Sequence, residues 1–114
     1  MTSGMNTIIY PVKDLTGAKA LYSRLLGVEP YVDAPYYVGF KVGDQEVGLD
    51  PNGHKQGLRG PIGYWEVGDI NESVQQLLAS GAEVQQPVRD VGGGKLVASI
   101  KDADGNITGL AQTP

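Results

Sequence analysis

The sequence predicts an α+β fold in which two βαβββ modules follow one another along the chain. The segment 10–15, Tyr-Pro-Val-Lys-Asp-Leu, recurs as 65–70, Trp-Glu-Val-Gly-Asp-Ile, with aromatic, valine, aspartate and aliphatic residues at matching positions. Each copy is followed by a helical pattern that stops at a glycine, and each half closes on a Gly-Leu pair. A repeat of about 50 residues indicates two copies of one supersecondary unit.

The first module is expected to run from about residue 5 to residue 50. Residues 6–12 alternate in the way that is typical of a strand. Asp14 can cap a helix that ends at Gly27 and whose apolar residues share one face, namely Leu15, Ala18, Leu21, Tyr22, Leu25 and Leu26. Three strands are expected next, at residues 28–32, 36–42 and 45–49, with a tight Gly43-Asp44 turn between the last two.

Residues 51–60 are rich in Gly, Pro and Asn, and we expect an irregular linker there. The second module, at about 61–112, should begin with a strand at 61–67. Asp69 and Glu72 form a plausible capping box for a helix that stops at Gly81. The remaining strands are expected at 82–85, 95–101 and 106–111, with a loop at Gly92–Gly94 and a turn at Asp104-Gly105.

Length and composition restrict the class of protein. The 114 residues suffice for a single domain, 1–114, that contains both modules. A net charge of -4 argues against a nucleic-acid partner, and the absence of cysteine excludes disulfides and thiolate metal sites. No apolar run approaches the roughly 20 residues that cross a bilayer. The first residues also lack the pattern of a secretory signal, so we expect no membrane partner and a cytoplasmic location.

These motifs resemble the vicinal oxygen chelate superfamily, which includes glyoxalase I, bleomycin-resistance proteins and extradiol dioxygenases. The resemblance covers almost the whole chain and is carried by segments 10–15, 25–28, 64–70 and 92–110. The last segment is similar to the family's Asp-Pro-x-Gly-Asn signature, with Ala103 in place of the proline. The resemblance implies a cupped mixed sheet around a central cavity, commonly in a homodimer.

The resemblance also implies four positions for the ligands of a divalent metal, typically His or Glu. Counting from the motifs places these positions at Thr7, Gly48, Ile62 and Gly109. Such an ion requires three or more oxygen or nitrogen donors from the protein. Thr7 offers a neutral hydroxyl, and the other three side chains offer no donor. We therefore expect no metal and no other cofactor, which disfavours chemistry that relies on a Lewis-acidic ion.

The ligand site is expected on the sheet face that the helices leave uncovered. Side chains alternate between the two faces of a strand, so Tyr64 and Glu66 should share the face of Ile62, whereas Trp65 should pack against a helix. Tyr36 and Tyr37 must point to opposite faces. Gly48 and Gly109 would either enlarge the cavity or mark a close backbone approach. The predicted ligand-binding residues are Thr7, Ile9, Gly48, Ile62, Tyr64, Glu66, Ile107 and Gly109.

Three functional hypotheses follow. The leading one is a metal-free protein that binds an apolar or aromatic small molecule, as bleomycin-resistance proteins sequester a drug. The alternative is a lyase, isomerase or dioxygenase-like enzyme of the same superfamily. It would use Glu66 as a metal-independent base, or displaced metal ligands such as His54, Glu46 and Glu66. The third is a non-catalytic dimer with a regulatory or structural role. The sole histidine, His54, lies in the linker and is expected at the surface.

Overall fold

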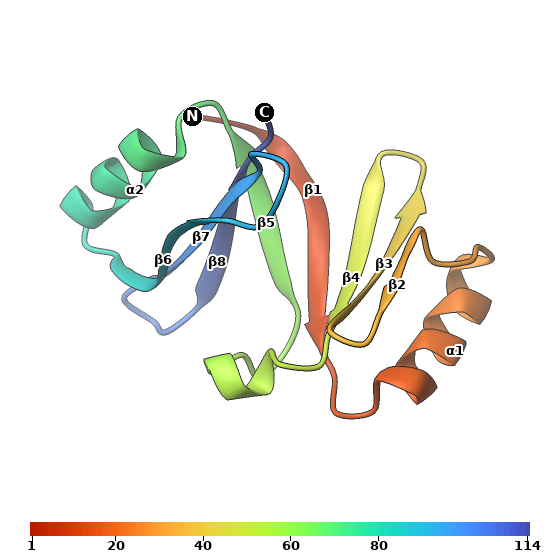
Figure 1. Ribbon diagram of the computed structural model, residues 1–114. Helices are drawn as coiled ribbons and strands as arrows, with labels where there is room; N and C mark the ends of the chain where they lie inside the picture. The colour runs from red at the N-terminus through yellow and green to blue at the C-terminus, as the bar shows by residue number, and fades with distance from the viewer. The chain divides into compact units, whose positions relative to one another are not determined.

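The computed structural model describes residues 1–114 and contains eight β-strands and two α-helices (Figure 1). Each half of the chain has the order strand, helix, strand, strand, strand. The predicted α+β fold of two βαβββ modules is therefore confirmed. The chain divides into two compact units, residues 6–62 and residues 63–114 with 1–5. No helix is long and apolar enough to cross a membrane.

The first unit holds the part of β1 from residue 6 onward, followed by α1, β2, β3 and β4. These five elements span Thr2–Pro11, Leu15–Leu26, Val32–Ala34, Tyr37–Val42 and Gln45–Asp50. Its strands lie in the order β2-β3-β4-β1. β1 runs parallel to β4, and the other neighbours are antiparallel. The β3–β4 turn is the predicted Gly43-Asp44 turn, and Gly43 has a φ of 59° there. A left-handed residue at the first turn position suits the twist of a hairpin.

The helix α1 begins and ends as its sequence predicts. The Asp14 side chain accepts a hydrogen bond from the Gly17 amide at 3.0 Å, and Gly27 has the left-handed φ of 71° that ends many helices. The helix covers β3 and β4 (Figure 1). The core beneath it consists of Val38, Phe40, Val47 and Leu49, with partly buried residues of β1 and α1 around them.

The exposure of Leu21 and Leu25 corrects the predicted apolar face of α1. Their side chains are 62% and 71% exposed, respectively, whereas Leu15, Ala18, Tyr22 and Leu26 pack on the core. The six apolar positions span a wider arc of the helix than the sheet covers, because α1 rests on one stripe of its surface. Leu21 and Leu25 therefore lie on the solvent side.

The second unit holds β5, α2, β6, β7 and β8, at Ile62–Val67, Ile70–Ala79, Glu83–Asp90, Leu96–Lys101 and Ile107–Gln112. Its strand order is β5-β8-β7-β6, with β5 parallel to β8 and the other pairs antiparallel. Asp69 caps α2 through the Glu72 amide at 3.1 Å. A separate core forms under this helix from Val67, Ile70, Val74, Ala98 and Leu110.

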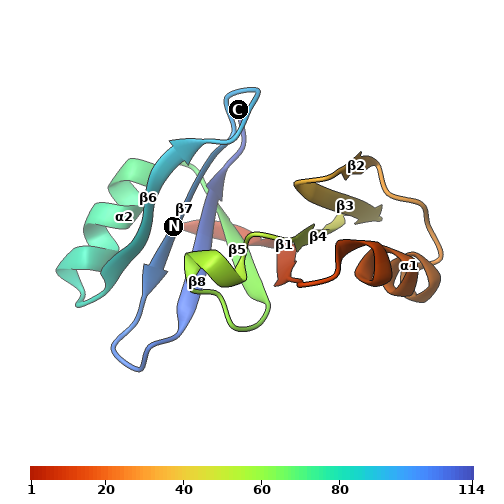
Figure 2. The same ribbon diagram turned by 60° about the horizontal axis from the view of Figure 1, so that its bottom comes forward.

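Trp65 does not enter this core, contrary to the prediction that it packs against a helix. Its side chain is 36% exposed, although it points to the face opposite that of Tyr64. The helix α2 lies against β6, β7 and β8 (Figure 2), so the core under it includes Val67 at the end of β5 but not Trp65. The alternation along the strand was thus predictable, but the position of the helix across the sheet was not.

Some boundaries also differ from the predictions. β2 starts at Val32 rather than at residue 28, because Pro30 has no amide to donate to a neighbouring strand. The linker is not wholly irregular, since His54–Gln56 forms a 3-10 turn, η1, that ends at Gly57 with a φ of 90°. β1 begins at Thr2, whose hydroxyl donates to the Glu66 carbonyl at 2.6 Å.

The segment most similar to the superfamily signature forms the turn between β7 and β8. One Asp102 carboxylate oxygen accepts from the amides of Asp104 and Asn106 at 2.9 and 2.8 Å, and the other accepts from the Asn106 side chain at 3.0 Å. Gly105 supplies the left-handed φ of 87°. These contacts lower the pKa of Asp102, chiefly through the hydrogen bonds from Asn106. The signature therefore encodes a turn.

Candidate functional site

The candidate site begins on the face of the first sheet that α1 does not cover, here called the helix-free face. Alternation along β1, β3 and β4 sends Tyr10, Phe40 and Leu49 toward the helix. The residues of opposite parity therefore share the helix-free face. They include Thr7, Ile9, Tyr37, Gly39, Lys41, Glu46 and Gly48.

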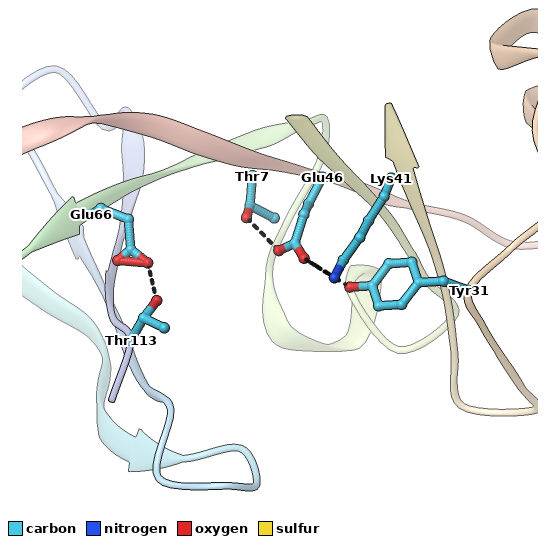
Figure 3. Close-up of polar contacts among 6 residues, drawn as sticks. All are labelled: Thr7, Tyr31, Lys41, Glu46, Glu66 and Thr113. Carbon is cyan, nitrogen blue, oxygen red and sulfur yellow. Dashed lines mark hydrogen bonds and ion pairs between the residues drawn. The ribbon is translucent and has the colours of Figure 1, made fainter. Parts of the chain in front are cut away.

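Glu46 is the centre of a polar cluster on this face (Figure 3). Thr7 lies directly across from it in the β1–β4 register, and the Thr7 hydroxyl donates to one carboxylate oxygen at 3.3 Å. The Tyr31 hydroxyl donates to the other oxygen at 3.1 Å. The Lys41 ammonium lies 3.9 Å from that same oxygen. Three different kinds of donor thus surround one carboxylate, whose side chain is 26% exposed.

Tyr31 is held in its neutral form by this environment. Burial raises its pKa to about 12, and the negative charge of Glu46 and the hydrogen bond to it act in the same direction. A neutral phenol keeps its proton and remains a donor to the carboxylate. The Lys41 ammonium also lies 4.6 Å from the centroid of the Tyr31 ring, within the range of a cation–π contact. The Lys41 ammonium therefore lies close to both the Glu46 carboxylate and the Tyr31 ring.

Glycines on this face make room for tyrosine rings. A Cβ atom at Gly48 would meet the Tyr37 ring, with its Cζ at 2.7 Å, and a Cβ at Gly39 would meet both Tyr31 and Tyr37 at 3.1 Å. The Tyr37 side chain therefore lies over Gly48, and the two rings flank Gly39. Of the adjacent pair Tyr36 and Tyr37, it is Tyr37 that belongs to this face, while Tyr36 is 69% exposed.

The second unit repeats the ring-over-glycine arrangement. Tyr64 is the cross-strand partner of Gly109, where a Cβ atom would meet Tyr64 Cδ2 at 2.5 Å. Glu66 follows on the same face, and its carboxylate accepts a hydrogen bond from the Thr113 hydroxyl (Figure 3). Ile62 is 2% exposed, and Ile107 is partly buried. Glu66 therefore shares this face with the ring of Tyr64.

The register decides which predicted residues lie together. Thr7, Ile9 and Gly48 share one face, but Gly48 is the partner of Ile9, and the β4 residue beside Thr7 is Glu46. The Gly-Leu pair of β4 pointed to Gly48 and missed Glu46, which lies two residues earlier on the same face. Tyr31, Tyr37 and Lys41 were also outside the predicted set of site residues. The period of two along β3 could have found Tyr37 and Lys41, whereas Tyr31 precedes β2 and reaches the cluster only through the tertiary fold.

Sequence comparison assigns the chain to a family. The profile of the Glyoxalase/Bleomycin resistance protein/Dioxygenase superfamily matches residues 4–109. The chain belongs to this superfamily. A comparison with curated protein sequences finds no match.

Solved structures share the superfamily fold. A superfamily member from Vibrio splendidus 12B01 is 16% identical with a TM-score of 0.73, over 95% of this chain and 97% of that one. Methylmalonyl-CoA epimerase from Mycobacterium tuberculosis is 18% identical with a TM-score of 0.72, over 99% and 89%. The Mn(II)-bound glyoxalase from Novosphingobium aromaticivorans is 18% identical with a TM-score of 0.73, over 97% of this chain and 39% of its own.

The donors of this chain do not fit the divalent-metal site that the superfamily implies. In the first module, Glu46 is a single carboxylate beside the neutral hydroxyl of Thr7. In the second, Ile62 and Gly109 have no donor atoms in their side chains. No group of three or more His, Cys, Asp or Glu side chains could hold a metal ion. His54 is exposed at the start of η1.

Two surface hollows, one in each unit, lie elsewhere. A shallow groove of about 570 Å³ runs between α1 and β2, where Lys19 and Asp33 form an ion pair of 2.5 Å. A second hollow of about 410 Å³ lies beside the start of α2, next to Met1 and Asp69. Neither hollow is lined by a predicted ligand-binding residue.

Proposed function

We propose that this protein binds a small molecule with an aromatic group and does so without a divalent metal. The observation that carries the proposal is the state of Glu46. It lies on the helix-free face, and Thr7, Tyr31 and Lys41 of the same chain already contact it. A metal ion would need further anionic or imidazole donors that the superfamily positions do not supply.

One tyrosine in each unit supports an aromatic ligand. Tyr37 and Tyr64 each lie over a glycine and remain partly exposed, so each presents an apolar ring surface close to the sheet. Aromatic rings placed in this way can stack with a flat ligand, by about 0.5–1.5 kcal/mol beyond the burial of apolar area. The proposed activity is thus sequestration of a small molecule. The bleomycin-resistance members of the superfamily are named for resistance to a drug. A homodimer is part of the proposal, and light scattering after gel filtration tests it.

Binding can be measured on metal-stripped protein with a panel of flat aromatic compounds. Trp65 is the sole tryptophan and is 36% exposed, so its fluorescence reports on binding alongside a thermal shift. We expect at least one compound to bind with saturation and to raise the melting temperature. Calorimetric titration with nickel, zinc and manganese should show no stoichiometric binding.

The adjacent tyrosines provide a matched control. The Tyr37→Ala substitution should weaken binding several-fold, since it removes a ring from the helix-free face. The Tyr36→Ala substitution removes the same ring from an exposed turn position and should leave binding unchanged. Tight metal binding, or ligand binding that requires added metal, would overturn the proposal.

The position of Glu66 favours a second candidate, a metal-independent lyase or isomerase. Its partly buried carboxylate accepts from the Thr113 hydroxyl on the face that also carries Tyr64. A carboxylate fixed in this way could take a proton from a bound substrate. Proton exchange from a carbon acid into solvent water would reveal such a base. If the Glu66→Gln variant exchanges protons as fast as the wild type, this candidate is excluded.

A further inference from the structure

The Lys41 ammonium marks a place where the chain already holds a cation. It lies 3.9 Å from a Glu46 carboxylate oxygen and 4.6 Å from the centroid of the Tyr31 ring (Figure 3). A carboxylate and the face of an aromatic ring both attract organic ammonium ions. The surroundings of the Lys41 ammonium therefore resemble a binding site for an organic cation. In this structure the cation is a side chain of the protein itself.

The anionic side of this corner is fixed in place, whereas the cation is not. Thr7 and Tyr31 each donate to a different oxygen of Glu46, which holds the orientation of the carboxylate. Lys41, by contrast, is 58% exposed and reaches the corner on a flexible stem. An exposed ion pair of this kind contributes little to stability. Another ammonium group can therefore replace Lys41 at small cost.

We propose that the corner formed by Thr7, Tyr31 and Glu46 binds the ammonium group of a ligand, which displaces the side chain of Lys41. This inference rests on the proposed binding function and names its ligand class, an aromatic amine. The Tyr37 ring lies beside the corner, since Tyr31 and Tyr37 both flank Gly39. A ligand whose ammonium group replaces that of Lys41 can thus place its ring against Tyr37. The net charge of -4 attracts such a cation.

Two probes separate the ammonium from the ring. Benzylamine is a cation at neutral pH, whereas benzyl alcohol has the same ring and a neutral head group. Titrations followed by amide NMR spectra should show that benzylamine binds about threefold to tenfold more tightly, as expected for one cation–π contact and one partly exposed charge pair. The shifted amides should include those of β3 and β4.

The Lys41→Met variant tests displacement directly. It keeps a long apolar stem but removes the competing ammonium, so affinity for benzylamine should rise by a similar factor, about threefold or more. Affinity for benzyl alcohol should not change. This gain in affinity keeps the inference testable even if the loss variants fold poorly.

Loss variants identify the contacts. Glu46→Gln and Tyr31→Leu should each abolish the preference for benzylamine, while Tyr31→Phe should retain most of it, because the ring face remains. The Glu83→Gln substitution on β6 removes an equal charge from an exposed position and serves as the control for net charge. It should leave the preference intact.

The outcomes distinguish this inference from the function on which it rests. Equal binding of both probes would overturn the ammonium site and leave the aromatic binding function standing. The same conclusion would follow if Lys41→Met bound benzylamine no more tightly than the wild type. Saturable binding of neither probe would count against both.

Discussion

Thr7 and Glu46 are direct partners across the parallel strands β1 and β4, and the Thr7 hydroxyl donates to the Glu46 carboxylate at 3.3 Å. The superfamily resemblance implies one metal-ligand position at Thr7 and another at Gly48, which lies two residues after Glu46. Here the pair forms a hydrogen bond within the protein, and Tyr31 and Lys41 complete the cluster. This cluster and other features of the fold lead to five predictions.

Tyr31 should be among the last of the six tyrosines to ionise. Its pKa is raised to about 12 by burial and by Glu46, and that of Tyr22 is raised by burial and by Tyr10. In an ultraviolet titration of tyrosinate, Tyr31→Phe should remove one late step. Glu46→Gln should move that step to lower pH without restoring the ordinary value, because burial remains. An unchanged late step in Tyr31→Phe would contradict the assignment.

The raised pKa of Tyr31 also determines how this residue changes the stability of the fold at high pH. The pKa of Tyr31 is 10.0 in the unfolded chain and about 12 in the fold, so the folded state binds the proton more tightly. Its contribution is fully present below pH 10.0 and is lost as the pH rises toward about 12. Urea unfolding across this window should show a smaller decline in Tyr31→Phe than in the wild type.

Alanine at Gly109 should be more destabilising than alanine at Gly48. The new Cβ at residue 109 would meet Tyr64 at Cγ, 2.7 Å away, near the base of the side chain, whereas at residue 48 it meets the far end of Tyr37. The Tyr37 ring can swing aside, but Tyr64 must change its rotamer or move the backbone. We expect about 1–3 kcal/mol of lost unfolding free energy for Gly109→Ala and less for Gly48→Ala, measured with urea.

Gly68→Ala is the control for these two substitutions, because a Cβ there meets nothing within 4 Å. It should change the unfolding free energy by less than about 0.5 kcal/mol. Gly48→Ala should nevertheless weaken binding of aromatic ligands, since it displaces Tyr37. A Gly48→Ala protein with normal stability and normal ligand affinity would refute the role given to this ring.

Asp102→Ala should lower the melting temperature at neutral pH by breaking the turn between β7 and β8. The pKa of Asp102 is lowered from 3.8 by its hydrogen bonds with Asn106, so the carboxylate stabilises the fold above that pH. This contribution is lost as the pH falls through the lowered pKa of the folded state. The difference between variant and wild type should therefore shrink in acid. Asp104→Ala, which removes an equal charge from the same turn, should have a smaller effect.

Replacing leucines with alanine should distinguish the core beneath α1 from the solvent-exposed side of that helix. Leu49 is 0% exposed, and Leu49→Ala should cost about 2–5 kcal/mol of unfolding free energy. Leu25 is 71% exposed, and Leu25→Ala should fall within about 0.5 kcal/mol of the wild type. Equal losses, measured by chemical denaturation, would show that Leu25 is covered in solution.

Local patterns in the sequence account for most of the fold. Asp14 and Gly27 define the ends of α1 because capping depends on a few neighbouring atoms. The repeat likewise predicted two modules of one helix and four strands. The errors fall where a distant segment decides the structure. Trp65 and Leu25 are apolar residues with the correct periodicity, but whether they are covered depends on where each helix rests on its sheet.

The candidate site was less accessible to sequence reasoning. The lack of metal donors at Ile62 and Gly109 can be read from residue types alone. Placing Glu46 beside Thr7 required the register of β1 against β4, which are separated by the whole first helix and two strands. Strand periodicity could not place Tyr31, because this residue lies in the segment between α1 and β2. Its hydroxyl donates to Glu46, which is on β4.

The sequence by itself determined the superfamily, the repeated α+β modules, the helix caps and the absence of the usual metal ligands. Each of these depends on residue identity or on short-range spacing. The tertiary structure alone decided that Thr7, Tyr31, Lys41 and Glu46 form one cluster. The physical reason is that strand register and side-chain reach bring together residues far apart in the chain, and a shift of a single residue would turn Glu46 to the opposite face.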